Sequence, residues 1–356
     1  MFNTLGLFPD EFLRIPFEDN YFEDIEKLSL FVSQCDAVVH LAAVNRHNEP
    51  EFIYKTNIEL VKRLINALEH SGNRPHILIS SSIQEDIDNL YGHSKKEGRI
   101  LLADWAEENR SVFTGFVFPN IFGPFGNPYY NSFIATFSHQ LTHNESPKVE
   151  IDKSVPLIYV TEAVNAIIES VRNRTDKKEY RINHTSERKV TEILKILQSF
   201  KSSYFENGVI PELNDQFEIN LFNTFRCYIN IQEIYPGHLK KNVDDRGSFV
   251  ETIKTSLGGQ FSFSTTKPGI TRGNHFHTRK IERFAVIKGK ARIQLRRIGT
   301  DEIMDFFLDG NEPSYVDMPV WYTHNITNTG DDELYTLFWI NEFYNPDDPD
   351  TYFEEV

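Results

Sequence analysis

The sequence predicts an α/β domain of the doubly wound type followed by an all-β barrel. Strands and helices alternate in the first part of the chain, which predicts a parallel sheet with helices on both faces. Many short strands, separated by Gly, Pro, Asn and Asp, follow Pro236. A chain of 356 residues exceeds the usual size of one domain, so we predict two, at residues 1–235 and 240–356.

The composition excludes several classes of protein. Hydrophobic residues make up 40% of the chain and aromatic residues 13%, which is enough for packed cores rather than disorder. The net charge is −15, from 37 basic and 52 acidic residues, so we expect no nucleic-acid partner. Two cysteines are too few for a secreted protein built on disulfides. With no signal-peptide pattern and no apolar run of about 18 residues, we expect no membrane contact and a cytoplasmic location.

Each element of the α/β domain is predicted from its pattern. Residues 35–42 (CDAVVHLA) and 76–82 (HILISSS) are short apolar runs typical of buried parallel strands. Between them, residues 51–72 carry apolar side chains at helical spacing and end in a glycine. A further helix is predicted at 94–110, and a third strand with a turn at 111–123. Right-handed crossovers between parallel strands then give a Rossmann-type arrangement.

The middle of the chain is mixed, and the C-terminal part is predicted to be all β. Helices are predicted at 129–141 and 160–174. Residues 211–234 carry an apolar stripe at helical spacing, which we expect to pack against the next domain. Short strands at regular intervals predict a small barrel or sandwich. These strands are expected at 249–255, 260–267, 283–289, 290–298, 302–310, 314–320, 324–330 and 334–343.

One group of residues indicates proton transfer coupled to hydride transfer. Tyr91 and Lys95 are four residues apart and so lie on one face of a helix. A protonated lysine beside a tyrosine lowers the pKa of the phenol, which then exchanges a proton with a carbonyl or carbinol oxygen. Ser82 ends the preceding strand, where open α/β sheets bind their ligands. The alternative is an ordinary exposed helix start, because this spacing alone is common.

SSS at 80–82, YGHSK at 91–95, HLAAVNR at 40–46 and TN at 56–57 together resemble the extended short-chain dehydrogenase/reductase family. That resemblance implies catalytic roles for Ser82, Tyr91 and Lys95, and an NADP(H) cofactor. Asn120, within PNIFG, would contact the substrate. The residues that the resemblance assigns to cofactor binding are Leu41, Ala42, Ala43, Asn57, Ser80, Tyr91, Lys95 and Pro119.

The N-terminal residues depart from that family, whose members open with a strand and a Gly-rich turn for the cofactor pyrophosphate. Gly6 is the only glycine in the first seventy residues, and no convincing buried strand precedes residue 35. Since the first strand of this fold lies mid-sheet, its absence would leave a strand edge unpaired inside the domain. We weigh three explanations and favour the first two: Met1 is internal to a longer chain, the gene is truncated, or a divergent N-terminus replaces the cofactor cradle.

A second group of residues indicates a metal site in the β domain. His275 and His277 are two residues apart on a strand and so face the same side. A turn at 278–281 would bring a second strand alongside with Glu282, and a later strand carries His324. Three imidazoles and a carboxylate suit Zn²⁺, and equally Ni²⁺, Mn²⁺ or Fe²⁺. Histidines on a polar surface strand are the alternative.

The spacing of this second group resembles the cupin family. Five residues separate Gly269 from His275, four separate His277 from Glu282, and six separate Glu282 from Gly289, as in the first cupin signature. The segment from Pro319 to Asn328, around His324, resembles the second signature, with Trp321 in the place of a turn glycine.

Two arginines lie in segments that are similar to the nucleotide-sugar 3,5-epimerase branch of cupins. These segments are DDRGSFVE at 244–251 and KPGITRGNHFH at 267–277. The resemblance implies that Arg246 and Arg272 bind the diphosphate of a substrate. Ordinary surface ion pairs are the alternative for both side chains. His275 is expected either as a metal ligand or as a general base, because a coordinated nitrogen cannot also take up a proton.

Nearly the whole chain resembles the bifunctional capsular-polysaccharide enzymes of the CapF type, through HLAAVNR, SSSIQ, PNIFG, NVDDRGSF, YTHNI and PDDPDTYFEEV among others. That resemblance implies that the cupin inverts C3 of a UDP-2-acetamido-2,6-dideoxy-4-keto-hexose. The reductase would then use NADPH to reduce the C4 ketone to UDP-2-acetamido-2,6-dideoxy-L-talose, toward UDP-N-acetyl-L-fucosamine. It also implies a homodimer.

Other classes of function stay open. With an inactive reductase half, the chain would act only as a cupin epimerase or as a module that binds a sugar or a metal. NADPH consumption with the 4-keto sugar distinguishes this case. A metal-dependent dioxygenase built on the same ligands is the other alternative, and redox-active iron with oxygen uptake would identify it.

Overall fold

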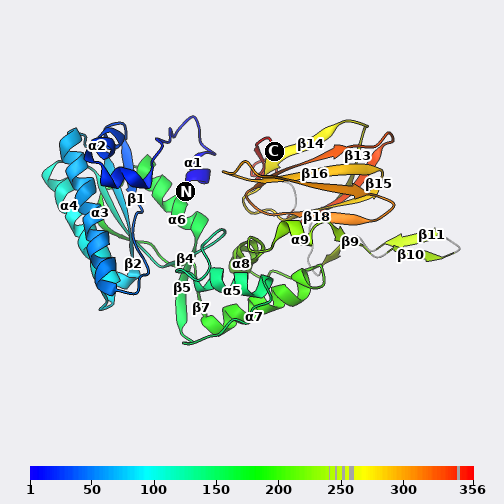
Figure 1. Ribbon diagram of the computed structural model, residues 1–356, viewed down its shortest axis with the longest axis horizontal. Coiled ribbons are helices and arrows are strands. Elements are labelled where there is room, and N and C mark those ends of the chain that lie inside the picture. Colours follow the sequence, from blue (N-terminus) through cyan, green and yellow to red (C-terminus); the bar gives the residue numbers. More distant parts are fainter. Residues whose placement is uncertain (240, 245–246, 251–252, 256–259, 343–344) are drawn as a thin grey trace. The chain divides into compact units, whose positions relative to one another are not determined.

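The structure is a computed structural model that describes residues 1–239, 241–244, 247–250, 253–255, 260–342 and 345–356 (Figure 1). The chain forms two compact units. The first unit comprises Met1–Phe133 and Ile151–Val190, and the second comprises Ile134–Glu150 and Thr191–Val356. Compactness therefore groups the helices between residues 191 and 235 with the β strands that follow them. The predicted domain boundary at 235–240 is based on the change in residue pattern near Pro236, and it stays a prediction.

A parallel sheet with the strand order β1-β2-β3-β6 forms the centre of the first unit (Figure 1). Its register places Ala37 opposite His76, and Ile77 opposite Phe113. β3 is buried along its whole length, as expected for a strand covered on both faces. The predicted doubly wound α/β domain is thus confirmed. The strands are β1 (Ala37–His40), β2 (His76–Ser82), β3 (Phe113–Phe118) and β6 (Lys177–Arg181).

Helices cover both faces of this sheet. On one face, Ile77 and Ile79 of β2 pack in a core with side chains of α2 (Ile25–Ser33), α3 (Pro50–Ser71) and α4 (Leu90–Glu108). On the other face, Leu78 packs in a core with side chains of α6 (Val160–Arg172). Successive residues of β2 therefore serve opposite cores, because side chains alternate across a strand.

Capping residues set the ends of the helices that carry functional residues. α3 ends at Gly72, whose left-handed φ of 69° lets its N–H close the last turn. α4 begins at Leu90 rather than at the predicted residue 94, because the Asn89 side chain accepts a hydrogen bond from the Gly92 N–H at 2.7 Å. Tyr91 therefore lies within the first turn of α4.

The predicted strand at 111–123 is two strands, because the chain leaves the main sheet after β3. Pro119 lacks the N–H that a ladder needs, and it separates β3 from β4. β4 joins a small sheet with the order β4-β5-β7. The strands of that sheet are β4 (Asn120–Phe122), β5 (Ser154–Tyr159) and β7 (Ser186–Lys189).

A cavity of about 700 Å³ lies against the outer edge of β1. Among the described strands, β1 pairs only with β2, and α1 (Phe2–Leu5), η1 (Asp19–Glu23) and α2 are the elements that precede it. Residues 37–42 line the cavity, together with N-terminal residues such as Phe12 and Phe17 and with Ile167 of α6. The expected free strand edge inside the domain is therefore present, and apolar side chains face it.

Two antiparallel sheets form the β part of the second unit, which confirms the predicted all-β cupin-like domain. Their inner faces enclose a core that includes Ile293, Leu308, Val316 and Ile326. One sheet consists of β13 (Gln260–Thr266), β20 (Leu334–Ile340), β15 (Glu282–Lys288), β18 (Ser314–Met318) and β9 (Gly237–His238). The other consists of β17 (Ile303–Asp309), β16 (Lys290–Arg297), β19 (Tyr322–Asn328), β14 (Thr271–Phe276) and β21 (Tyr352–Phe353).

Helices of the second unit pack on this β domain through a buried polar cluster. Asp317 of β18 accepts hydrogen bonds from Arg283 Nε at 2.7 Å and Nη2 at 2.9 Å, and from the hydroxyls of Tyr204 and Tyr235. Arg226 donates to the Met318 carbonyl at 3.0 Å. Residues 211–234 therefore contact the β domain through Arg226 and, in a shared apolar core, through Ile231. The helices are α5 (Phe133–Thr142), α7 (Val190–Phe200), η3 (Lys201–Phe205), α8 (Gln216–Arg226) and α9 (Ile231–Ile234).

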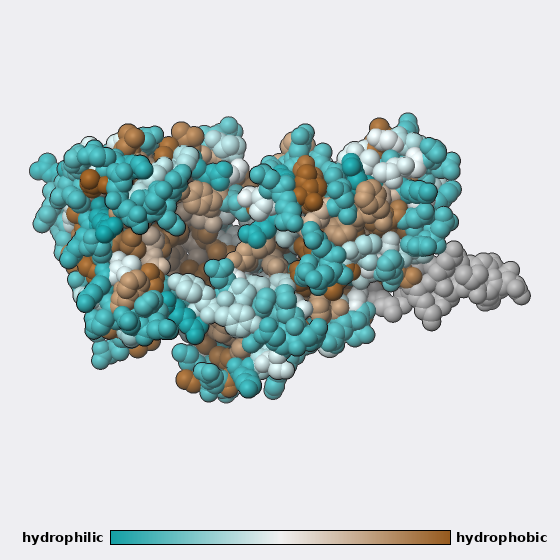
Figure 2. Space-filling view, viewed as in Figure 1, coloured by the Kyte–Doolittle hydropathy of each residue, from teal (hydrophilic) through white to brown (hydrophobic). Residues whose placement is uncertain are grey.

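The face drawn in Figure 2 is mainly hydrophilic, as a chain with 25% charged residues predicts. Hydrophilic residues cover most of the face drawn in Figure 2, and hydrophobic residues appear there in small separate patches. Within the residues that the structure describes, every helix is too short or too polar to cross a membrane.

Candidate functional site

The turn after β2, which begins at Ser82, lies against the first turn of α4, which carries Tyr91. The Ser82 hydroxyl accepts a hydrogen bond from the Gln84 N–H at 3.2 Å and caps the short helix η2 (Ile83–Asp86). Gly92 touches this turn so closely that an added Cβ would lie 2.0 Å from the Gln84 carbonyl oxygen. Only glycine allows this approach, so the YGHSK motif has a structural reason for its glycine as well as a chemical reason for its tyrosine and lysine.

Lys95 of α4 is buried, with 6% of its surface exposed. Burial lowers the pKa of Lys95 to about 8, and the Glu85 carboxylate opposes this shift. Burial and the Lys95 charge together lower the pKa of His40, the last residue of β1, to about 3. The Lys95 ammonium group therefore acts electrostatically on the end of β1.

Tyr91 differs from its expected protonation behaviour. Burial and, secondarily, Tyr130 raise the pKa of Tyr91 to about 12, so the expectation of a lowered pKa is wrong. The reason is that removal from water disfavours the charged phenolate. Tyr91 thus keeps its proton at neutral pH, as a proton donor requires.

Asn57 is buried, and its side-chain amide makes three hydrogen bonds within the protein. Its Oδ1 accepts from the Val44 N–H at 2.7 Å, and its Nδ2 donates to the Val44 carbonyl at 3.1 Å and to Ser94 Oγ at 3.0 Å. Ser94 in turn donates to the Tyr91 carbonyl at 2.7 Å. Asn57 therefore fixes the segment after β1 relative to Tyr91. The analysis of the sequence missed Ser94, although it lies within YGHSK.

The other residues predicted to contact the cofactor or substrate lie in different surroundings. Leu41 and Ala42 line the cavity beside β1, and Ala43 follows them half-buried. Asn120 is exposed, and its amide donates to the Pro156 carbonyl at 3.0 Å. The two remaining residues are a half-buried side chain on β2 and a buried one after β3, namely Ser80 and Pro119.

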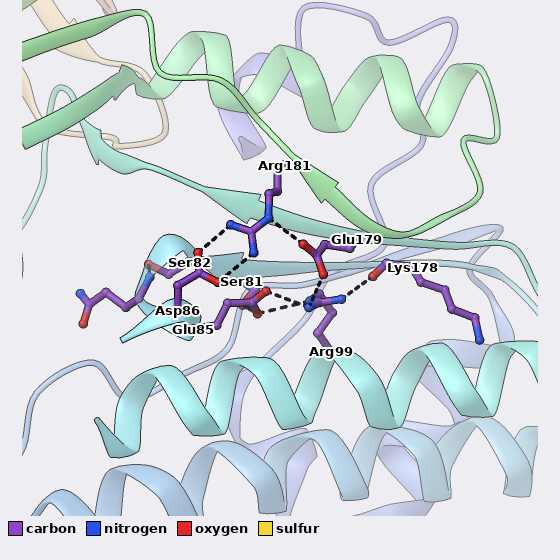
Figure 3. Close-up of polar contacts among 9 residues, drawn as sticks. Ser81, Ser82, Glu85, Asp86, Arg99, Lys178, Glu179 and Arg181 are labelled. Atoms are coloured by element: carbon purple, nitrogen blue, oxygen red, sulfur yellow. Dashed lines mark hydrogen bonds and ion pairs between the residues drawn. The ribbon is translucent and has the colours of Figure 1, made fainter. Parts of the chain in front are cut away.

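A charged network holds the turn after Ser82 (Figure 3). Arg99 of α4 donates to Glu85 Oε1 at 2.8 Å and Oε2 at 3.3 Å, and both side chains are at most 5% exposed. Ser81 Oγ donates to the same carboxylate at 2.7 Å. Arg99 also contacts Glu179 at 3.1 Å, and Arg181 joins Glu179 to Asp86 through two ion pairs. The network links η2, α4 and β6.

The metal-ligand candidates of the β domain come together between the two sheets. His275 of β14 lies opposite His324 of β19 in the ladder, and Glu282 begins β15 in the facing sheet. One donor atom from each of these residues and from His277 lies within 4.8 Å of all the others. The structure therefore gathers all four predicted ligands at one point.

The geometry of these atoms fits a bound cation. Glu282 Oε2 lies 3.1 Å from His277 Nε2 and 3.2 Å from His324 Nε2. Although these three atoms are buried, none makes a hydrogen bond within the part of the chain that the structure describes. Orphaned buried polar atoms are costly, and tetrahedral ligands about 2.0–2.1 Å from a zinc ion lie about 3.3 Å apart. The donor set therefore fits a divalent metal.

The ring orientations leave the Nε2 atoms of two imidazoles free to bind. His277 Nδ1 lies 2.5 Å from the Asp350 carbonyl and His324 Nδ1 lies 3.3 Å from the Tyr322 carbonyl. A carbonyl only accepts, so each Nδ1 donates its proton there, and the Nε2 side of each ring faces Glu282 and the other donors. Burial, followed by the two neighbouring histidines, lowers the pKa of His275 to about 4, so the His275 ring is neutral at pH 7.

The sequence suggested that the turn at 278–281 brings its two flanking strands side by side, and this expectation is wrong. β14 pairs with β19 and β21, whereas β15 pairs with β18 and β20. The turn instead carries the chain from one sheet to the other. Glu282 consequently approaches the histidines across the core rather than along a ladder.

Two unusual backbone positions shape this site. Gly273 has φ of 104° at a bulge in β14, and an added Cβ would lie 2.8 Å from the His324 carbonyl oxygen. Trp321 keeps a left-handed φ of 60° although it is not glycine, and its ring stacks on Phe276 with centroids 5.5 Å apart. The backbone N–H of Trp321 donates to the His277 carbonyl at 2.8 Å. The turn conformation is therefore retained with tryptophan in it.

Of the two arginines predicted to bind phosphate, the structure describes Arg272. Arg272 of β14 is exposed and donates to the Thr265 carbonyl at 3.1 Å. Arg246 lies outside the described residues.

Comparisons with known proteins agree with this two-part organisation. Residues 16–183 match the NAD dependent epimerase/dehydratase family, and residues 242–352 match the polysaccharide biosynthesis C-terminal domain. The chain is 31% identical over 330 residues to the UDP-2-acetamido-2,6-β-L-arabino-hexul-4-ose reductase of Pseudomonas aeruginosa, covering 92% of this chain and 88% of that protein. It is 26% identical over 122 residues to the spore coat polysaccharide biosynthesis protein SpsL of Bacillus subtilis, covering 32% of this chain and 81% of SpsL.

The fold also has a solved relative. The structure matches the capsular polysaccharide assembling protein CapF of Staphylococcus aureus with a TM-score of 0.57 and 37% identity, covering 93% of this chain and 90% of that chain. The match of the first unit to an NAD-dependent family implies NAD(P) use. This chain therefore belongs to the CapF-like family of bifunctional epimerase/reductases, enzymes that act on nucleotide sugars in polysaccharide biosynthesis.

Proposed function

We propose that this enzyme converts a UDP-2-acetamido-2,6-dideoxy-4-keto-hexose into UDP-2-acetamido-2,6-dideoxy-L-talose, on the route to UDP-N-acetyl-L-fucosamine. The β domain inverts C3, and the α/β domain then reduces the C4 ketone with NADPH. The observation that carries the proposal is the convergence of four donor atoms in the β domain, three of them from buried residues. Its support is the relative that acts, by its name, on a UDP-2-acetamido-2,6-hexulose.

Inversion of C3 needs a base and a group that stabilises negative charge. The hydrogen on C3 is acidic because it is α to the C4 ketone, and its removal gives an enolate that is reprotonated on the opposite face. His275, His277, Glu282 and His324 would hold a divalent metal, which supplies a Lewis acid for the developing oxyanion when bound. Arg246 and Arg272 are proposed to bind the diphosphate of the substrate.

Reduction of the C4 ketone needs a proton on the oxygen and a hydride on the carbon. Tyr91 donates the proton to O4, and its raised pKa keeps that proton in place until the reaction. Ser82 donates a hydrogen bond to the same oxygen, and the Lys95 ammonium stabilises the tyrosinate that forms. NADPH supplies the hydride when bound. Leu41, Ala42, Ala43, Asn57, Ser80 and Pro119 are the proposed cofactor contacts beside Tyr91 and Lys95.

A second candidate function has an observation in its favour. Residues 1–36 contain helices and turns, and neither a strand nor a Gly-rich turn lies among them. A pyrophosphate cradle of the usual kind is therefore missing from the segment before β1. In this case the protein would epimerise C3 without reducing C4, or would only bind the sugar or the metal.

One assay separates these functions. The protein is incubated with the UDP-4-keto sugar and NADPH in D₂O, and deuterium at C3 and NADPH oxidation are measured together. The proposal predicts both signals, whereas exchange without oxidation indicates the epimerase alone. Tyr91→Phe should abolish oxidation and leave exchange intact. Loss of both signals in this variant would contradict the assignment of the two steps to two domains.

The finer properties of the enzyme are also proposals. We propose zinc as the metal, a homodimer as the assembly, and the cytoplasm as the location. Four protein ligands fill a tetrahedral zinc, so participation in the chemistry requires a fifth position. Chelation of the metal should therefore abolish C3 exchange if the metal is catalytic, and should leave the exchange rate unchanged if the metal is structural. Analytical ultracentrifugation tests the dimer.

A further inference from the structure

The C-terminal residues 350–354, here called the C-terminal strap, contact the segments that carry three of the four metal-ligand candidates. Asp350 is the buried anchor of the strap, with 2% of its surface exposed. Its Oδ1 accepts from the Thr278 N–H at 3.1 Å and from the Thr278 hydroxyl at 2.6 Å. Its Oδ2 accepts from the N–H groups of Arg279 at 2.9 Å and Lys280 at 3.0 Å. One carboxylate thus satisfies the turn that follows His277.

The backbone of Asp350 contacts the ligand itself. The Asp350 carbonyl accepts the Nδ1–H of His277 at 2.5 Å, on the side of the ring away from Glu282. This bond fixes both the tautomer and the orientation of the imidazole, so that Nε2 faces the other donors. Asp350 holds this position with a left-handed φ of 41°, which a residue with a side chain adopts only when its surroundings enforce it.

The rest of the strap fastens the strands of two further ligands. β21 pairs with β14 and places Phe353 opposite His275, while the Tyr352 ring stacks on Phe276 at 5.4 Å. The Glu354 carbonyl accepts a hydrogen bond from the hydroxyl of Thr323, the residue before His324. Glu354 is itself held by an ion pair to Arg296 at 2.8 Å.

We propose that the C-terminal strap retains the metal, with Asp350 as the positioning residue that keeps His277 ready to bind. This inference rests on the proposed metal site and adds what controls metal release. Asp350 touches none of the donor atoms and acts through the orientation of His277 and the turn behind it. Loss of an outer-shell partner of a ligating histidine typically weakens metal affinity about 10–100-fold.

The test compares two aspartates of the same C-terminal segment in the full-length, zinc-loaded protein. Asp350→Ala removes the buried carboxylate, whereas Asp348→Ala removes an exposed one that pairs with Arg279 at the surface. Transfer of zinc to a colorimetric chelator is followed over time. Asp350→Ala should release zinc about 10–100-fold faster than the wild type. Asp348→Ala should release it at the wild-type rate.

A second readout distinguishes retention from general stability. The melting temperature is measured for each variant with zinc and after chelation. A purely structural role of Asp350 would lower both temperatures equally. Metal retention instead predicts that the increment due to zinc shrinks, because a tenfold weaker affinity removes about 1.4 kcal/mol of metal-linked stability at saturating metal. Thr278→Val, which deletes only the 2.6 Å hydrogen bond, gives the same comparison if Asp350→Ala does not fold.

The outcomes separate the strap from the site on which it depends. A wild-type protein that takes up no stoichiometric zinc, cobalt, nickel or manganese would overturn the metal centre and the strap together. A wild-type protein that binds metal, beside Asp350→Ala and Thr278→Val variants with unchanged release, would overturn the strap alone. Faster release with a smaller zinc-dependent increment in melting temperature supports the inference.

Discussion

Replacing Arg99 by methionine tests how the turn that carries Ser82 is held. Arg99→Met keeps much of the apolar stem of the side chain but leaves the Glu85 carboxylate buried with Ser81 as its remaining hydrogen-bond donor in the network of Figure 3. Breaking a buried ion pair by removing one partner costs about 3–5 kcal/mol. The loss of two charge-assisted hydrogen bonds to Glu85, at about 1.5–3 kcal/mol each, leads to a similar value.

A matched control lies in the same network. Arg181→Met breaks the pairs with Asp86 and Glu179, in which Arg181 is 47% exposed and its partners are 53% and 43% exposed. Exposed ion pairs contribute about 0–1 kcal/mol because water screens them. The two variants remove the same kind of group at neighbouring sites, so burial is the main difference between them.

Amide hydrogen exchange measured by mass spectrometry suits this test, because the chain has two compact units and global unfolding need not be two-state. Peptides from β2 and α4 should lose about 100-fold or more of their protection in Arg99→Met, as a loss of about 3 kcal/mol requires. Adding Glu85→Gln should restore much of the protection, since no buried charge then lacks a partner. Equal, small losses in Arg99→Met and Arg181→Met would refute this reasoning.

Three further predictions follow from the structure. NADPH-dependent reduction should fall as the pH rises through about 8, because Lys95 then loses the charge that supports the proposed reaction. A steady-state pH profile of the reduction rate that stays flat well above pH 8 would contradict this role of Lys95. Burial raises the pKa of Cys35 to about 11 and of Cys227 to about 12, so iodoacetamide should modify neither thiol in the native protein, as intact mass will show. Gly273→Ala should lower the zinc content and the melting temperature, because the Cβ of the new alanine would push β14 away from the His324 carbonyl. A Gly273→Ala protein with full zinc content would count against this packing.

The sequence alone predicted much of the fold. Apolar runs located β1 and β2, and helical spacing located α3 to within a residue or two, because each pattern records which side of one element is buried. The four metal-ligand candidates were also found in advance. The two-residue spacing of His275 and His277 reflects the period of a strand, so their common direction follows from local geometry.

Other features depend on which segments of the chain are in contact, and these features could be seen only in the tertiary structure. The chain crosses between sheets after His277, and Asp350 contacts the turn there from about seventy residues away. The pairing of Arg99 with Glu85 and the raised pKa of Tyr91 are likewise set by neighbours in space. A local sequence pattern encodes the burial of one element, whereas desolvation and partner choice depend on everything packed around it. For this protein, the sequence identified the residues that we propose to carry the chemistry, and tertiary packing decided how they are oriented, charged and held.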